Sequence, residues 1–218
     1  MPSLTDIRIG GVARLSSCDW PGQLVATIFC QGCPWACRYC HNPHLIPATG
    51  DEQIEWASVL GFLAARRGLL DGVVFSGGEP TLQQGLEDAI RQVRAMGFRI
   101  GLHTGGPYPG RMAQLLPLVD WVGFDIKAPK AGYDRITNAR NSGDKALRSL
   151  RLLLDSGVDY DLRTTVHPDL LSDDDLDVLA AEVQAIGGKG HRLQKFRADG
   201  CSDDALIRSR ALHQHGSA

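Results

Sequence analysis

Residues 24–43 read LVATIFCQGCPWACRYCHNP, a strand pattern followed at once by three closely spaced cysteines. Its first part, Leu24–Cys30, is a run of apolar and β-branched residues with the length of a buried strand. Cys33, Cys37 and Cys40 follow directly, in the pattern C-x3-C-x2-C. Because the two gaps differ, a loop presents these thiols better than a helix, and three thiolates on one loop can hold a soft metal centre. The sequence therefore predicts a strand that ends in a metal-binding loop.

Two kinds of metal centre fit the cysteine loop. Zinc needs a fourth ligand, for which His41 and His44 stand nearby, although zinc sites usually take their cysteines as pairs from two separate places. An iron–sulfur cluster held by three thiolates leaves one iron open to another ligand. The loop alone leaves both alternatives open. The other cysteines, Cys18, Cys30 and Cys201, are interpreted as buried or incidental thiols.

The composition is that of an ordinary globular domain. The chain has 218 residues, of which 43% are hydrophobic and 22% charged. The first residues, MPSLTDIRIGG, lack the apolar stretch of a signal peptide, and no apolar run has the length of a membrane span. We therefore expect a cytoplasmic protein, in which clustered cysteines indicate metal or redox chemistry. The net charge of −2 argues against a nucleic-acid partner, and a membrane partner is not expected either.

Strand and helix patterns alternate along the rest of the chain. Strands are expected at Leu24–Cys30, Val73–Ser76, Arg99–His103, Trp121–Ile126, Asp159–Val166 and Leu193–Phe196. Helices are expected at Glu55–Arg67, Leu82–Met96, Arg111–Leu116, Asp144–Asp155, Ser172–Ala185 and Ser202–His213. Strict alternation implies parallel strands with right-handed crossovers, and six units are too few for a closed eight-stranded barrel. The predicted fold is α/β, an open six-stranded parallel (β/α)6 partial barrel.

The partial barrel is expected to occupy residues 24–200. Residues 1–23 are expected to form a lead-in with turns, and residues 201–218 a C-terminal helix and tail. In parallel α/β folds the loops after the strands carry the chemistry. Polar residues at the predicted strand ends are therefore the candidates for a binding site.

Three further strand ends carry such candidates. The second strand runs into residues 77–80, GGEP, where the glycines allow a ligand to approach the backbone and the carboxylate can accept from an ammonium group. The fourth ends in Asp125 and Lys127, which alternation places on one face, either as a salt bridge or as partners of a ligand. On the fifth, Arg163 suits a carboxylate.

The cysteine loop resembles the signature of the radical S-adenosylmethionine (SAM) superfamily, C-x3-C-x-Φ-C, with Tyr39 as the aromatic residue Φ. The resemblance implies a [4Fe–4S] cluster on Cys33, Cys37 and Cys40. It also implies that the amino and carboxylate groups of SAM bind the fourth iron, and that Tyr39 packs near the adenine.

The resemblance extends to the later strand ends. It implies that Gly78 and Glu79 hold the SAM amino group, and that Asp125 and Lys127 lie beside the ribose and the methionine carboxylate. The residues it implies for SAM binding are Tyr39, His41, Gly77, Gly78, Glu79, Thr104, Asp125, Lys127 and Arg163.

The third strand end both fits and departs from this pattern. Residues 103–106 read HTGG, where related activating enzymes often have D-T-N-G. Thr104 fits, whereas His103 replaces the acid and puts any cation site that uses it in doubt. The sequence does not decide whether His103, His167 or Arg197 touches SAM.

The residues around the loop are similar to those of glycyl-radical-enzyme activases. The pattern D-[YW]-P-G…F-x-Q-G-C-x3-C-x2-C-H-N-P runs from Asp19 to Pro43, and Gln23 departs from it because relatives often have Lys or Arg there. The chain resembles most the activating proteins of anaerobic (class III) ribonucleoside-triphosphate reductase. This implies an enzyme that reductively cleaves SAM to a 5′-deoxyadenosyl radical and generates a glycyl radical on that partner, with an electron donor such as flavodoxin or ferredoxin.

Other functions remain open at this point. One is activation of another glycyl-radical enzyme, of the pyruvate formate-lyase type. A second is a radical SAM enzyme that acts on a small molecule, such as a deazaguanine precursor synthase. A third, from outside the enzymes, is a zinc-binding interaction module.

Overall fold

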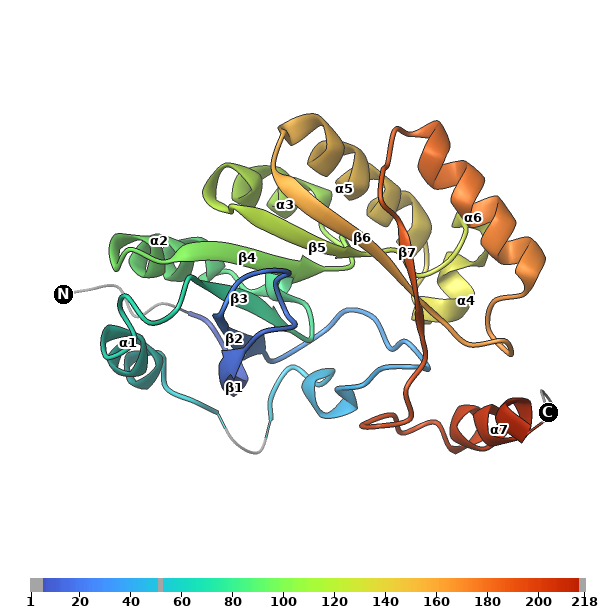
Figure 1. Ribbon diagram of the computed structural model, residues 1–218, viewed down its shortest axis with the longest axis horizontal. Helices are drawn as coiled ribbons and strands as arrows, with labels where there is room; N and C mark the ends of the chain where they lie inside the picture. The colour runs from blue at the N-terminus through green and yellow to red at the C-terminus, as the bar shows by residue number, and fades with distance from the viewer. Residues whose placement is uncertain (1–5, 51–52, 216–218) are drawn as a thin grey trace.

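The computed structural model describes residues 6–50 and 53–215 of the chain. Its centre is a curved sheet of seven strands that follow one another in chain order (Figure 1). The strands are β1 (Ile9–Ser16), β2 (Val25–Cys30), β3 (Gly72–Gly77), β4 (Arg99–Thr104), β5 (Trp121–Asp125), β6 (Asp159–Val166) and β7 (Arg192–Lys195). Strands β2 to β7 run parallel, and β1 runs antiparallel to β2. The predicted α/β fold with six parallel strands is confirmed.

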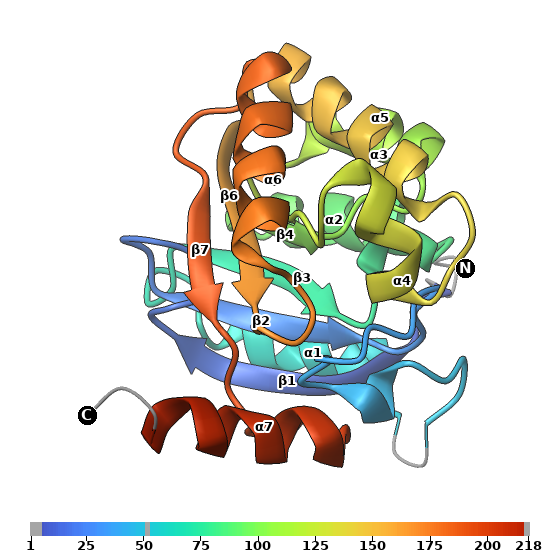
Figure 2. The ribbon, with the colours of Figure 1, turned by 90° about the vertical axis from the view of Figure 1, so that its right-hand side faces the viewer.

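The helices follow the strands in the expected alternation. They are α1 (Trp56–Ala64), α2 (Leu86–Ala95), α3 (Pro109–Leu115), α4 (Tyr133–Thr137), α5 (Ser142–Ser156), α6 (Asp173–Ala185) and α7 (Asp204–His215). Short 3-10 turns occur at η1 (Pro43–Leu45), η2 (Pro80–Leu82), η3 (Leu116–Leu118) and η4 (Lys130–Gly132). Helices α2, α3, α5 and α6 lie along one face of the sheet (Figures 1 and 2). Within the described part of the chain, none of these helices is long and apolar enough to cross a membrane.

Two elements of the structure, β1 and α4, were not predicted from the sequence. Strand β1 lies within residues 1–23, which the sequence indicated as a lead-in with turns. Gly10 and Gly11 weaken its strand pattern, and a Cβ at Gly10 would press on the side chains of Leu45 and Gln31. Helix α4 has five residues, too few to show a helical period.

The register of the parallel strands brings their C-terminal ends to one edge of the sheet. Cys30 at the end of β2 pairs with Gly77 of β3, and Asp125 at the end of β5 pairs with Arg163 of β6. The loops that carry the candidate residues therefore meet at this edge.

The two faces of the sheet are packed differently. The main core fills the face toward the helices, where α2 buries Leu86, Ile90 and Val93 at helical spacing. On the opposite face, Val25, Val74 and Trp121 from three strands form a second, smaller cluster with Trp20 from the segment between β1 and β2. The rings of Trp20 and Trp121 stack with their centroids 5.4 Å apart. They fill the inside of the open barrel at the N-terminal ends of the strands.

Candidate active site

A cavity of about 590 Å³ lies inside the open barrel, on the same face of the sheet as the tryptophan cluster. All the candidate site residues from the sequence line it. They are Cys33, Cys37, Tyr39, Cys40, His41, Gly77, Gly78, Glu79, Thr104, Asp125, Lys127 and Arg163. The structure thus gathers residues from five strand ends at one place.

Backbone hydrogen bonds fix the cysteine loop at several points. The amides of Gly32 and Cys33 donate to the carbonyls of Leu45 and Ile46, at 2.7 and 3.0 Å. Further along, the amide of Cys40 donates to the carbonyl of Cys37 at 3.0 Å, which closes a turn between two of the cysteines. The loop is therefore shaped by its own chain before any metal binds.

Gln31 is a functional residue whose role the sequence did not reveal. Its buried side-chain amide donates to the carbonyls of His44 and Pro47, at 3.0 and 2.8 Å. Its backbone carbonyl accepts from the side chain of Gln83 at 2.6 Å. The glutamine of the F-x-Q-G-C pattern thus holds the segment after the cysteine loop in place. In the sequence, the one sign of this role was that a polar residue, Gln31, directly follows a buried strand.

Burial controls the protonation of the three cysteines. It raises the pKa of the Cys33 thiol to about 12 and that of Cys37 to about 11, and it raises the pKa of Cys40 as well. The Lys127 ammonium group acts in the opposite direction on all three thiols. A metal centre that binds thiolates here must therefore displace protons, and Lys127 makes this easier.

The geometry does not match a closed zinc site. In residues 6–50 and 53–209, no three His, Cys, Asp or Glu side chains gather closely enough to hold a single metal ion. His41, one of the two candidates for a fourth ligand, donates from Nε2 to the carbonyl of Arg197 at 3.0 Å.

Gly77, the last residue of β3, packs against β2, and Gly78 packs against the start of the cysteine loop. A Cβ at Gly77 would lie 2.4 Å from the amide nitrogen of Cys30, and one at Gly78 would lie 2.3 Å from the carbonyl oxygen of Gly32. Gly77 also has a φ of +108°, which favours glycine. The glycines are therefore required for the close contact with β2 and the cysteine loop, in addition to the ligand approach that the sequence suggested.

Glu79 is buried and joins the ends of β3 and β4. Its Oε1 accepts from the amide and hydroxyl of Thr81, at 3.0 and 2.6 Å, and from the hydroxyl of Thr104 at 2.8 Å. Its Oε2 accepts from the amide of Gly105 at 3.1 Å. Burial raises the pKa of Glu79, while these hydrogen bonds act against the rise. Oε2 has one protein donor and can accept another from a ligand.

Asp125 pairs with two cations. Its Oδ1 lies 3.1 Å from Nε of Arg163, and its Oδ2 lies 3.7 Å from Nζ of Lys127. Burial would raise the pKa of Asp125, but Arg163, Lys127 and His103 outweigh it and lower the pKa to about 2. One carboxylate facing two cations leaves an excess positive charge on the cavity wall. The salt bridge that the sequence considered is present, and it leaves capacity for an anionic ligand group.

His103 is held as a neutral ring. Nε2 donates to the carbonyl of Asp19 at 2.7 Å, and Nδ1 accepts from the hydroxyl of Ser76 at 3.2 Å. Burial and the nearby Arg163 lower its pKa to about 4. His103 therefore lines the cavity without supplying the negative charge that an acid would bring there.

Residues 27–182 match the family model described as the Radical SAM superfamily. The chain belongs to this superfamily. The putative glycyl-radical enzyme activating enzyme MJ1227 of Methanocaldococcus jannaschii is 30% identical over 185 residues, covering 81% of this chain and 75% of that protein. The pyruvate formate-lyase-activating enzyme of Clostridium pasteurianum is 31% identical over 170 residues, covering 75% of this chain and 70% of that protein. The chain is thus an enzyme of the activase type, and the zinc-binding module without catalysis is set aside.

The radical SAM fold is also seen among solved structures. SuiB of Streptococcus suis, in its crystal structure with the precursor peptide SuiA, superimposes with a TM-score of 0.63 at 10% sequence identity. The match covers 85% of this chain and 44% of SuiB, so this chain spans less than half the length of SuiB. At this identity the likeness concerns the fold alone.

Membership of the radical SAM superfamily implies SAM and a [4Fe–4S] cluster, and the cavity fits both. Three cysteines on one loop are the soft donors that iron–sulfur clusters take. The Tyr39 hydroxyl is buried and is the one buried side-chain oxygen or nitrogen in residues 6–50 and 53–209 without a hydrogen-bond partner. A bound ligand that accepts from Tyr39 would satisfy it.

The sequence did not decide whether His103, His167 or Arg197 contacts SAM, and the structure places them differently. His103 and Arg197 line the cavity, whereas His167 lies outside it. His167 is buried, and its Nε2 donates to the carbonyl of Leu206 at 3.0 Å. Of the three remaining cysteines, Cys30 is buried in β2 as expected, Cys18 is exposed at the cavity, and Cys201 contacts the backbone of Arg38.

Proposed function

We propose that the chain activates anaerobic (class III) ribonucleoside-triphosphate reductase by generating a glycyl radical on it. The observation that carries this proposal is the single cavity that joins the cysteine loop, the GGE turn and the Asp125–Lys127–Arg163 charges inside an open barrel. Relatives named as glycyl-radical enzyme activating enzymes support the class of partner. The run from Asp19 to Pro43 supports the choice of the reductase within that class.

Cys33, Cys37 and Cys40 are the proposed ligands of the [4Fe–4S] cluster. When bound and reduced, the cluster supplies the electron that cleaves SAM to methionine and a 5′-deoxyadenosyl radical. The chain contributes a preformed loop, a nearby Lys127 that favours thiolates, and a buried setting that keeps water away from the reacting atoms. An electron donor such as flavodoxin or ferredoxin is proposed as the reductant.

The proposed SAM contacts follow from the charges on the cavity wall. Oε2 of Glu79 and the backbone at Gly78 would hold the ammonium group, because the carboxylate keeps a free acceptor site. Lys127 and Arg163 share one carboxylate between them, so they retain positive charge for the carboxylate of the methionine moiety. Tyr39 would face the adenine, with its hydroxyl free to donate. Gly77, Thr104 and His41 complete the proposed site by orienting these groups.

The open side of the barrel suits a protein substrate. Cys18 and Asp19, next to β1, line the same cavity as Gln194 and Lys195 of β7. These residues belong to the two ends of the strand order, and in the described part of the chain β1 and β7 are not neighbours in the sheet. A loop of a partner protein can therefore enter between the two edges and bring its glycine to the SAM site.

The test mixes the reconstituted, reduced enzyme and SAM with candidate partners under anaerobic conditions. We expect a glycyl-radical signal by electron paramagnetic resonance on the class III reductase. Since a relative is named as a pyruvate formate-lyase-activating enzyme, pyruvate formate-lyase is the second partner to test. A signal on that enzyme and none on the reductase would overturn the choice of partner. Failure to cleave SAM at all would overturn the proposed activity.

A further inference from the structure

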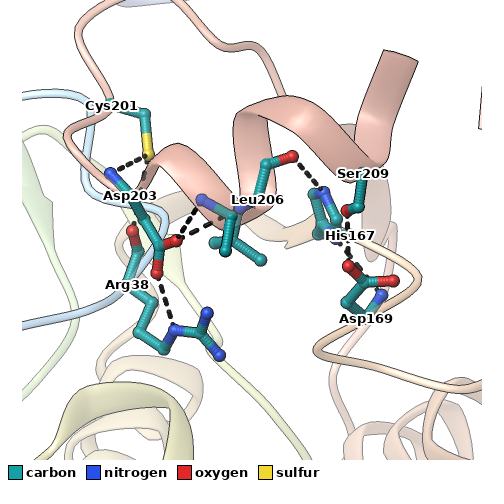
Figure 3. A network of polar contacts seen from close by, with 8 residues as sticks. Arg38, His167, Asp169, Cys201, Asp203, Leu206 and Ser209 are labelled. Carbon is teal, nitrogen blue, oxygen red and sulfur yellow. Dashed lines mark hydrogen bonds and ion pairs between the residues drawn. The ribbon is translucent and has the colours of Figure 1, made fainter. Parts of the chain in front are cut away.

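The segment after β7 folds back onto the cysteine loop. Residues 197–209, here named the C-terminal clasp, run from Arg197 through the first turns of α7 (Figure 3). They lie between the cysteine loop on one side and the loop after β6 on the other. The sequence indicated only a terminal helix here, with no link to the cysteines.

Three hydrogen bonds join the clasp to the cysteine loop. Nε of Arg38 donates to Oδ2 of Asp203 at 2.7 Å, in an ion pair at the surface in which Asp203 is the less exposed partner. Sγ of Cys201 donates to the carbonyl of Arg38 at 3.5 Å, and Nε2 of His41 donates to the carbonyl of Arg197 at 3.0 Å. Arg38 and His41 stand on either side of Cys40 in the chain.

The backbones of the two segments also touch. Gly200 has a φ of +77°, and a Cβ there would lie 2.2 Å from the carbonyl oxygen of His41. Such a contact leaves no room for a side chain, so the clasp backbone lies directly against the loop.

The clasp is itself anchored to the barrel. Oδ1 of Asp203 accepts from two amides of the first turn of α7, as an N-cap does. Nε2 of His167 donates to the carbonyl of Leu206 at 3.0 Å, and the hydroxyl of Ser209 donates to Asp169. His167 and Asp169 lie just after β6, so the clasp connects the end of this strand to the cysteine loop (Figure 3).

The other two cysteines have different supports. The amide of Cys33 donates to the carbonyl of Ile46, and the amide of Ala36, next to Cys37, donates to the carbonyl of Thr137 in α4. Near Cys40, the side-chain hydrogen bonds of Arg38 and His41 go to the clasp, and the His41 ring also stacks on Phe196 just before it. Each cysteine is thus steadied by a different part of the fold.

We propose that Arg38 and Asp203 are positioning residues that hold Cys40 in the place that a cluster ligand must take. The proposal rests on the function proposed above, because it concerns the same cysteine loop. A cluster needs its thiolates at fixed separations, so an anchor beside one cysteine sets how readily the loop binds iron. The pair acts through the loop and does not touch the reacting atoms.

The experiment measures alkylation of each cysteine in the full-length apoprotein by iodoacetamide, followed by peptide mass spectrometry. Asp203→Asn keeps a capping acceptor but removes the charge, and Arg38→Gln removes the other partner. Both variants should raise the alkylation rate of Cys40 about threefold, while the rates of Cys33 and Cys37 stay unchanged. Arg38→Lys, which keeps the charge, should stay near the wild-type rate, as should the control Asp204→Asn.

Two results would overturn the proposal. One is an unchanged rate at Cys40 in both charge-removing variants. The other is an equal rise at all three cysteines, which would indicate a general loosening of the fold. A second readout is the rate at which a chelator removes iron from the reconstituted variants, which should rise with the Cys40 rate. Because alkylation involves neither SAM nor a partner, its outcome is independent of a failure of the wild-type enzyme to cleave SAM.

Discussion

Tyr39 shows how a single residue can be kept ready for a ligand. Its ring is buried and lies under Nζ of Lys127, 5.7 Å from the ring centroid, yet its hydroxyl has no partner among the described residues. A buried hydroxyl without a partner costs the folded chain free energy. The ligand-free protein therefore carries a penalty that binding can relieve.

This predicts opposite effects of removing two buried tyrosine hydroxyls. Tyr39→Phe should raise the free energy of unfolding of the ligand-free chain by about 1 kcal/mol and weaken SAM binding about fivefold. Tyr133→Phe is the control, because the hydroxyl of Tyr133 accepts from the amide of Lys127 at 3.1 Å, and its loss should destabilise the chain by about 1 kcal/mol. Urea unfolding and calorimetric SAM titration measure both. Equal destabilisation by the two variants would show that Tyr39 has a partner within the protein.

Asp125 predicts a pH dependence of stability. Its pKa is lowered to about 2 in the folded chain, against roughly 3.9 when unfolded, mainly because Arg163 and Lys127 outweigh its burial. Its contribution is therefore present above about pH 4 and is lost as the pH falls to about 2. Since the carboxylate is about one-third exposed, we expect a contribution of about 1 kcal/mol.

Asp125→Asn measures this contribution by difference. The variant should be less stable than the wild type at pH 7, since Arg163 and Lys127 lose their anion. The difference in unfolding free energy between the wild type and the variant should shrink as the pH falls from about 5 to about 2. Urea unfolding at a series of pH values measures this difference. A gap that stays constant with pH would mean that the carboxylate is not stabilised by these cations.

At the scale of elements, the contact between the GGE turn and the cysteine loop is the critical one. A Cβ at Gly78 would meet the carbonyl oxygens of Gly32 and Leu45, at 2.3 and 2.7 Å, and backbone atoms cannot easily yield. Gly78→Ala should therefore lower the free energy of unfolding by about 2 kcal/mol and impair cluster binding. Gly110→Ala is the matched control, because open space surrounds that position in α3 and the change should be neutral or slightly stabilising. Equal stability of the two variants in urea would refute the close contact.

Sequence patterns captured most elements but missed one edge of the sheet. The buried strands β2 to β6 are short apolar runs, and α6 begins at a capping box of Ser172 and Asp175, so local patterns predicted them well. Strand β1 escaped because Gly10 and Gly11 break its pattern, and because its partner is β2, with which it pairs antiparallel across an intervening loop. Local propensity carries no information about such a partner.

At the scale of the whole molecule, the site was predictable because the fold repeats one rule. Parallel strands bring their C-terminal ends together, so the cysteine loop, GGE turn and Asp125–Lys127 pair had to meet. The C-terminal clasp follows no such rule. Arg38 and Asp203 are 165 residues apart in the chain. Charged residues are frequent throughout the sequence, so nothing in it indicates that these two form a pair.

The central claim is that this open barrel delivers a radical from SAM directly to a glycine of a partner protein. The most direct measurement uses class III reductase whose glycines carry deuterium at the α carbon, with mass spectrometry of the 5′-deoxyadenosine formed. With direct transfer, deuterium from the reductase should appear in 5′-deoxyadenosine as the glycyl radical forms. 5′-Deoxyadenosine without deuterium, formed while the reductase becomes radical-bearing, would contradict direct transfer from the glycine.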